Sequence, residues 1–128
     1  MAKEILLIDD DGDELEVFSD ALLRVDKNFK PFQAKNLEEA MAYLEAGLPA
    51  FIFIDYNMPR LNGLECLAAL RALNKVADAR IILYSNHITE AVRQKAIELG
   101  AFNCIQKPAT INELSEKLID VLDNQIHF

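Results

Sequence analysis

The chain has 128 residues, of which 52% are hydrophobic and 27% are charged, and this composition is ordinary for one globular domain with its own core. Its formal net charge of -8 argues against a nucleic-acid partner, because binding to phosphates needs a basic face. No apolar run is long enough to cross a membrane, and the first residues lack the pattern of a signal peptide.

In chain order, the apolar pattern predicts five strands that alternate with five helices. The strands are expected at residues 4–9, 29–36, 51–54, 80–85 and 101–106, and the helices begin near residues 15, 37, 64, 90 and 111. Pro31 places the second strand near the edge of the sheet, where proline is tolerated. This alternation predicts an α/β fold, with a mostly parallel sheet and helices on both faces.

Short motifs predict where several helices begin or end. Asn36 with Glu39, and Thr110 with Glu113, have the spacing of capping boxes. Gly100 predicts the C-cap of the fourth helix. The acidic residues before and at the start of the first helix, Asp11, Asp13 and Glu14, suit the positive end of its dipole.

The two cysteines, Cys66 and Cys104, lie in apolar segments without the spacing of a redox or metal motif. They predict free thiols in a reducing cytoplasm. No linker, internal repeat or low-complexity tract divides the sequence. We therefore expect a single cytoplasmic domain over residues 1–128.

Polar side chains gather where the predicted strands end. The carboxyl ends of parallel strands lie at one edge of such a sheet, where ligands bind. The residues delivered there are Asp9, Asp10 and Asp11 from the first strand, Asp55 and Asn57 from the third, Ser85 from the fourth, and Lys107 with Pro108 from the fifth. Carboxylates from neighbouring strand ends repel unless a cation lies between them, which predicts a Mg²⁺ site. Asp55 is the candidate nucleophile that accepts a phosphoryl group.

Each of these residues also has a simpler interpretation when it is taken alone. Asp10 or Asp11 can be a helix N-cap, and we assign Asp11 to capping. Lys107 can pair with Asp55 and later with a phosphoryl oxygen, or it can be a solvated surface lysine. Pro108 predicts a fixed Lys107–Pro108 peptide, with a cis form as one option. Ser85 can donate to a phosphoryl oxygen or to a local backbone group.

Several short motifs occur together and in order, namely Ile8-Asp9-Asp10, Asp55-Tyr56-Asn57-Met58-Pro59, Gly63, Ser85 and Lys107-Pro108. In this combination the chain resembles the receiver domain of response regulators, the phosphorylated modules of two-component signalling. The resemblance covers essentially the whole chain. It implies a flavodoxin-like three-layer sandwich, with a five-stranded parallel sheet in the order 2-1-3-4-5 and five helices.

The resemblance also implies a role for each site residue. Asp55 is then the phosphoacceptor, and Ser85 and Lys107 are the switch residues that sense the phosphoryl group. Asp10 binds Mg²⁺ directly, Asp9 binds it chiefly through water, and the backbone carbonyl of Asn57 is a further ligand beside Asp55.

The function implied by this family is signalling, and the only reactions catalysed are the protein's own phosphorylation and dephosphorylation. The donor is a phosphohistidine on a sensor histidine kinase or a histidine phosphotransfer protein, and acetyl phosphate is a small-molecule substitute. Phosphorylation is expected to switch a face made of the fourth helix, the fifth strand and the fifth helix, which then binds a downstream protein. No nucleic-acid or membrane partner is expected.

Four positions depart from the usual pattern of the family. Cys104 stands where many relatives have an aromatic residue that swings inward on activation. Asn86 follows the switch serine, where a small residue is common, and Ala109 follows Lys107-Pro108, where an aromatic is frequent. His87 lies where family side chains influence dephosphorylation, and it is either a pH-sensitive neighbour of the phosphate or a solvated loop residue.

Three other functions stay open at this point. A Mg²⁺-dependent aspartyl-phosphate phosphohydrolase needs a second aspartate where this chain has Asn57, and a cap domain for which there is no room. A flavodoxin-like cofactor carrier needs a phosphate-binding loop where this chain has Asp9 and Asp10. A receiver-like module that binds partners without phosphorylation is the third alternative, and Cys104 is the residue that favours it.

Overall fold

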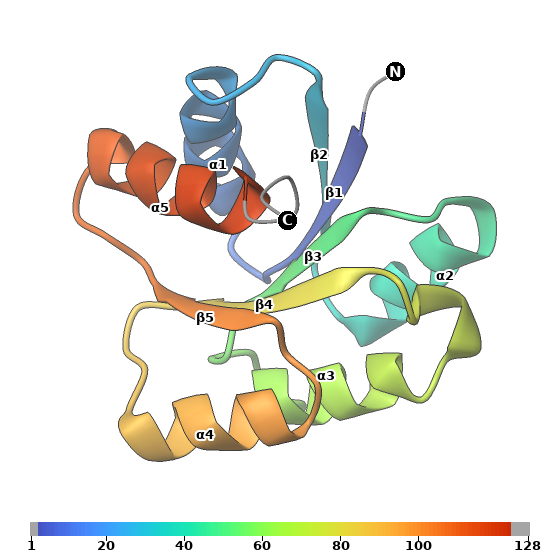
Figure 1. Cartoon of the computed structure of the whole chain (residues 1–128). Helices are drawn as coiled ribbons and strands as arrows, with labels where there is room; N and C mark the ends of the chain where they lie inside the picture. Colours follow the sequence, from blue (N-terminus) through green and yellow to red (C-terminus); the bar gives the residue numbers. More distant parts are fainter. Residues whose placement is uncertain (1–2, 124–128) are drawn as a thin grey trace.

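The structure is a computed structural model that describes residues 3–123, and its strands form one parallel sheet (Figure 1). The strands are β1 (Lys3–Ile8), β2 (Phe29–Ala34), β3 (Phe51–Ile54), β4 (Arg80–Ser85) and β5 (Asn103–Gln106). Their order is β2-β1-β3-β4-β5, which confirms the predicted topology and the position of the proline-containing strand at an edge. Among the residues described, no helix is long and apolar enough to span a membrane.

Helices cover both faces of the sheet, as the alternating pattern predicts (Figure 1). The helices are α1 (Glu14–Leu23), α2 (Leu37–Ala46), α3 (Gly63–Arg71), α4 (Glu90–Glu98) and α5 (Ile111–Asp123), with a short 3₁₀ helix η1 (Asn74–Val76). One layer contains α1 and α5, and the other contains α2, α3 and α4. The third helix ends at Arg71, and Leu73 is already extended before η1.

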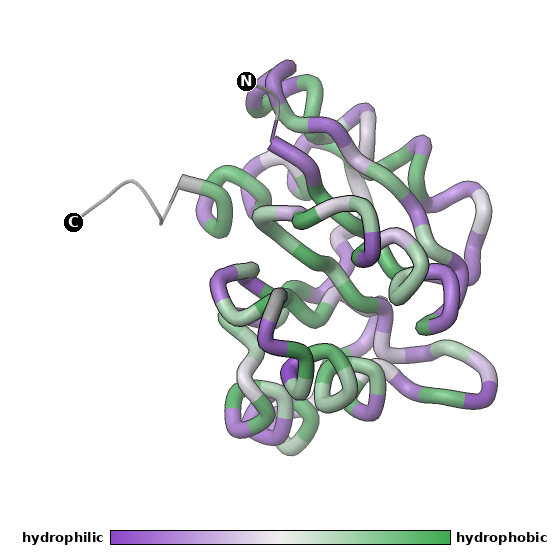
Figure 2. The backbone as a smooth tube through the Cα atoms, turned by 90° about the vertical axis from the view of Figure 1, so that its right-hand side faces the viewer, coloured by the Kyte–Doolittle hydropathy of each residue, from purple (hydrophilic) through white to green (hydrophobic). Residues whose placement is uncertain are grey.

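The central strand β3 shows why the sheet has two separate cores. Successive side chains of a strand point to opposite faces. Phe51 and Phe53 therefore pack beneath α1 and α5, whereas Ile52 and Ile54 pack beneath the other three helices. The ring of Phe18 from α1 meets Phe53 edge to face at a centroid distance of 4.9 Å. Figure 2 shows mainly hydrophobic stretches in the middle of the molecule and many hydrophilic residues in the peripheral loops.

The start of α3 is stabilised by a capping box that is not among those predicted above. The Asn62 side chain accepts a hydrogen bond from the backbone N–H of Glu65, and the Glu65 carboxylate accepts one from the backbone N–H of Asn62, both at 3.0 Å. The Asn-x-x-Glu spacing at residues 62–65 was the available signal. This box holds the first turn of α3 directly after the segment that follows β3.

The predicted caps form only in part. At α2 the Asn36 side chain accepts from Glu39 N–H, but the Glu39 carboxylate accepts from the N–H of Lys35 rather than from that of Asn36. Before α5, Thr110 Oγ1 accepts from the backbone N–H of Glu113 and its hydroxyl donates to the Glu113 carboxylate. The C-cap of α4 is Leu99, and Gly100 is the next residue, with a φ of 106° that favours glycine.

We expect Asn62→Ala to lower the free energy of unfolding by about 1 kcal/mol, because it removes the cap acceptor and leaves an N–H of α3 without its partner. Urea denaturation of the wild type and the variant measures the difference. Asn74→Ala is the matched control, since Asn74 is exposed and the residue before η1 is Leu73. An equal loss in both variants would contradict a specific role for the capping box.

Candidate functional site

Four strand ends bring the predicted site residues to one edge of the sheet. Asp9 directly follows β1, Asp55 directly follows β3, Ser85 is the last residue of β4, and Lys107 directly follows β5. The strand register aligns Ile8 with Ile54, so the two aspartates that follow them are neighbours. Asp9 and Ser85 are fully buried, and Asp55 is 7% exposed. The expectation that these residues converge is confirmed.

Asp55 is held by neighbours on its own loop and on β4. The Ser85 hydroxyl donates to Asp55 Oδ1 at 3.1 Å, and the backbone N–H of Asn57 donates to the same oxygen at 3.2 Å. The Asn57 amide in turn donates to Ser85 Oγ at 3.2 Å. The Ser85 side chain therefore reaches the carboxylate instead of bonding only to its local backbone, and a hydroxyl stands beside the candidate nucleophile.

Asp9, Asp10 and Asp55 form the acidic cluster. One carboxylate oxygen from each residue lies within 4.8 Å of the other two. Asp10 is exposed, whereas Asp9 is buried and accepts a hydrogen bond from the backbone N–H of Asp11 at 3.0 Å. Carboxylate oxygens at this spacing are the ligands that hard divalent cations such as Mg²⁺ prefer, so the donor set fits that ion.

The carboxyl group of Asp55 is poised between opposing influences. Burial raises its pKa above the ordinary value, the charge of Lys107 lowers it, and the charge of Asp9 raises it again, with a net increase. The folded protein thus carries an electrostatic penalty for ionising Asp55. A cation among the three carboxylates relieves such a penalty.

Lys107 has different partners from the one that the sequence suggested. Its Nζ lies 3.0 Å from Asp9 Oδ2 and 2.9 Å from Glu14 Oε1, and among residues 3–123 no ion pair joins it to Asp55. The interpretation as a solvated surface lysine is contradicted, since the side chain is 11% exposed, and the pairing with Asp55 is limited to an attraction between the two charges that lowers the pKa of Asp55. Glu14, in the first turn of α1, is the second direct partner of the ammonium beside Asp9. The Lys107–Pro108 peptide is trans, since residues 3–123 contain no cis bond.

The ammonium of Lys107 stays charged although it is largely buried. Burial alone would lower its pKa, but hydrogen bonds to Glu14 and Asp9 outweigh burial and raise it. The ammonium also lies 5.0 Å from the centroid of the Tyr84 ring. A fixed positive charge therefore stands at the buried side of the acidic cluster.

Two contacts of the site residues have no signal in the sequence. Glu14 was assigned only to the helix dipole, yet it binds Lys107. Gln33, from the edge strand β2, donates through its side-chain amide to the backbone carbonyls of Asp9 and Asp11, at 2.7 and 2.8 Å. These bonds hold the loop after β1 in place. No local motif identifies either contact, because each depends on how distant segments pack.

The remaining predicted residues lie around the site or within the core. Asp11 accepts from the backbone N–H of Asp13 at 3.0 Å, a local turn that leads into α1. Asn86, His87 and Ala109 are exposed. Cys104 is buried, and burial raises the pKa of its thiol. Both cysteines are free and buried, as predicted.

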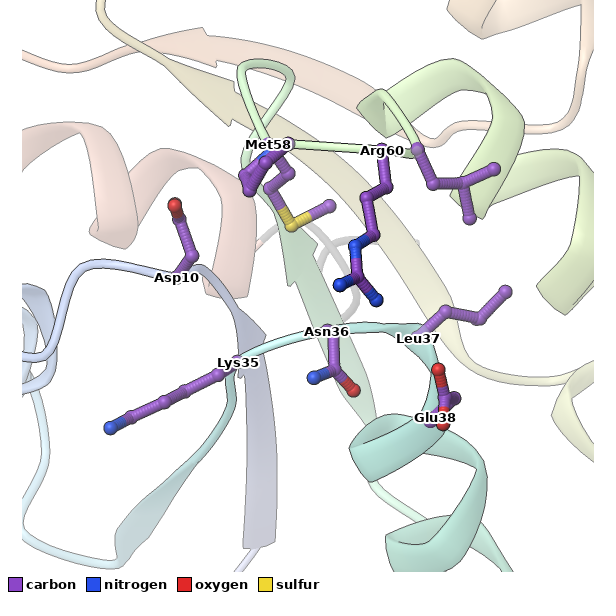
Figure 3. A pocket seen from close by; sticks show the side chains of 9 residues that line it. Asp10, Lys35, Asn36, Leu37, Glu38, Met58 and Arg60 are labelled. Atoms are coloured by element: carbon purple, nitrogen blue, oxygen red, sulfur yellow. The ribbon is translucent and has the colours of Figure 1, made fainter.

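A cavity of about 520 Å³ borders the acidic cluster (Figure 3). It lies between the loops that follow β1, β2 and β3, and Asp10 lines it, but Asp9, Asp55 and Lys107 do not. In Figure 3 the side chains of Met58 and Arg60 extend from the segment after β3 toward Asn36. The cavity therefore adjoins the exposed side of the cluster without containing the candidate nucleophile.

Comparison with known proteins gives a consistent result. The family model described as the response regulator receiver domain matches residues 5–119. The chemotaxis protein CheY homolog of Campylobacter jejuni (strain 81-176) is 32% identical over 120 residues, which cover 93% of this chain and 92% of that protein. The cyclic di-GMP phosphodiesterase response regulator RpfG of Xanthomonas campestris pv. campestris is 28% identical over 92% of this chain, but the chain spans only 31% of RpfG.

A solved structure supports the same fold. The chemotaxis response regulator CheY4 of Vibrio cholerae superposes with a TM-score of 0.80, over 97% of this chain and 98% of that one. At a sequence identity of 22%, this match shows only that the two folds are alike.

Proposed function

Because this chain belongs to the response regulator receiver domain family of two-component signalling, we propose that Asp55 is the residue that accepts the phosphoryl group. One observation carries the proposal. Asp55 lies at the carboxyl end of a buried strand, within reach of two further carboxylates, and it accepts a hydrogen bond from Ser85. The acidic cluster is suited to phosphorylation, because a cation and hydrogen-bond donors can surround a transferring phosphoryl group there.

In the proposed reaction an Asp55 carboxylate oxygen forms a bond to phosphorus as the bond to the donor's leaving atom breaks. The bonding electrons leave with that atom, which is a histidine nitrogen in a phosphohistidine or a carboxylate oxygen in acetyl phosphate. The product is an acyl phosphate on Asp55. Ser85 donates to one phosphoryl oxygen, and Lys107 offers its charge to another.

Asp9, Asp10 and Asp55 are the residues that would hold Mg²⁺, and we assign the backbone carbonyl of Asn57 as a further ligand by its position in the family motif. The bound ion would neutralise charge on the phosphoryl oxygens. Asp9 is held by Lys107 and by the N–H of Asp11, and by its position in the family motif it would bind the ion chiefly through water. Asp10 is exposed and free to turn toward an incoming ion.

The output is proposed to be a change in the face formed by α4, β5 and α5. Ser85 ends β4, which leads into α4, and Lys107 directly follows β5, which leads into α5. A displacement of either side chain therefore acts on the start of the next segment. We propose a sensor histidine kinase or a histidine phosphotransfer protein as the donor, a downstream protein as the reader, and the cytoplasm as the location.

The test of the function is the intact mass of the purified protein after incubation with acetyl phosphate, with Mg²⁺ and with excess EDTA. One added phosphoryl group that requires Mg²⁺ is the expected result. If acetyl phosphate gives no adduct and beryllofluoride with Mg²⁺ leaves the protein's NMR spectrum unchanged, the proposal is wrong. The chain would then be a phosphorylation-independent binding module.

We expect Asp10→Asn to raise the Mg²⁺ concentration needed for half-maximal phosphorylation by about tenfold or more, because it removes one anionic ligand. The measurement is a Mg²⁺ titration of the phosphorylation rate. Asp11→Asn is the matched control, because it changes the net charge by the same amount at the neighbouring residue. Its amide oxygen can still accept the hydrogen bond from the backbone N–H of Asp13. Equal shifts in the two variants would mean that Asp10 acts only through general electrostatics.

A further inference from the structure

Lys107 is shared between two carboxylates, and only one of them belongs to the acidic cluster. The second is Glu14, the first residue of α1, whose Oε1 lies 2.9 Å from Lys107 Nζ. The side chains of Lys107 and Glu14 are 11% and 14% exposed. An ion pair so shielded from water is stronger than an ordinary surface pair.

This arrangement commits the ammonium to two carboxylates other than that of Asp55. A lysine ammonium has three N–H donors, and two of them serve Asp9 and Glu14. Asp55 is bonded instead by Ser85 and by the backbone of Asn57. Any movement of Nζ toward a phosphoryl oxygen on Asp55 therefore competes with its bonds to Asp9 and Glu14.

The local charge balance adds to this effect. Glu14, Asp9, Asp10 and Asp55 are four carboxyl groups near the single ammonium of Lys107. A phosphoryl group brings more negative charge to the same point. The Glu14 carboxylate therefore favours the unphosphorylated state chiefly by occupying Lys107, with a smaller contribution from repulsion of the added charge.

We propose that Glu14 is a positioning residue that holds Lys107 away from Asp55 and so lowers the stability of the phosphorylated state relative to the unphosphorylated one. The inference rests on the proposed role of Asp55 as phosphoacceptor. Through Glu14, helix α1 would influence the equilibrium between the unphosphorylated and the phosphorylated state. A partner that contacts the first turn of α1 and displaces Glu14 would favour phosphorylation.

The test uses beryllofluoride with saturating Mg²⁺, which imitates a phosphoryl group on an aspartate. Glu14→Gln should lower the apparent dissociation constant of beryllofluoride, measured by NMR titration, by about threefold or more, since it removes the competing charge but keeps the size of the side chain. Glu14→Ala should shift it in the same direction. Glu16→Gln is the matched control, since Glu16 is exposed in the same turn of α1 and the charge change is equal.

A second measurement separates positioning from a general effect on the fold. In a Lys107→Ala background, Glu14→Gln should lose most of its effect on beryllofluoride affinity, because the group on which Glu14 acts is absent. A change of undiminished size in this background would overturn the inference, as would Glu14→Gln binding no tighter than Glu16→Gln. Failure of the wild type to bind beryllofluoride would instead overturn the proposed function of Asp55.

Discussion

Asp55→Asn is expected to abolish phosphorylation, with no phosphoryl adduct after incubation with acetyl phosphate and Mg²⁺ under conditions that modify the wild type fully. The amide of asparagine is not a nucleophile under these conditions, and within residues 3–123 no other carboxylate has the same surroundings. Asp9 is tied to Lys107 and to a backbone N–H, and Asp10 is exposed. Intact mass spectrometry measures the adduct directly.

Asp10→Asn serves as the control for this experiment, because it alters the same cluster and keeps Asp55. It is expected to be modified slowly, and faster when Mg²⁺ is raised. An adduct of normal size and rate on Asp55→Asn would move the nucleophile elsewhere and contradict the proposed site. Peptide mapping would then identify the modified residue.

The Asp55→Asn variant should be more stable than the wild type at neutral pH in metal-free buffer. Burial raises the pKa of Asp55, so the folded state is penalised for holding the ionised group, and asparagine carries no charge to penalise. The wild type should recover stability relative to the variant as the pH falls through the raised pKa, and the difference should vanish below about 3.9, the ordinary aspartate value. Urea denaturation across this range measures the effect. Added Mg²⁺ should stabilise the wild type more than the variant.

Gly63→Ala is expected to lower the free energy of unfolding by about 3 kcal/mol, since overpacking at a rigid position is costly. A Cβ at residue 63 would lie 2.7 Å from the Cα of Tyr56, 2.8 Å from the carbonyl oxygen of Asp55 and 2.9 Å from a methyl group of Leu83. Two of these three atoms are backbone, so no rotation of a side chain relieves the contact. Urea denaturation measures the loss of stability.

The matched control is Gly12→Ala, because a Cβ at residue 12 meets nothing within 4 Å. It should change stability little. Gly63→Ala should also slow phosphorylation in the folded fraction, because relief of the contact moves the backbone that positions the Asp55 carboxylate. A Gly63→Ala protein of wild-type stability would show that α3 can shift away from this segment at little cost.

The sequence by itself determined the elements whose signals are local. Phe51–Ile54 is four apolar residues followed by an aspartate and, soon after, a proline, and this pattern alone predicted a buried strand that ends at Asp55. The family motifs added the strand order, which periodicity does not reveal. Asp9, Asp10, Asp55, Ser85 and Lys107 were all placed at the correct edge, because each follows a parallel strand and such strands end on the same side.

Only the tertiary structure decided which of these groups bond to one another. Lys107 and Asp9 are 98 residues apart in sequence, and the choice of Glu14 over Asp55 as the second partner of Lys107 depends on where α1 packs against β2 and α5. The bonds from Gln33 to the loop after β1 and the close approach of Gly63 to Asp55 have the same origin. Periodicity and spacing describe one segment at a time, whereas these contacts are set by side-chain reach between segments that meet only after the sheet has formed.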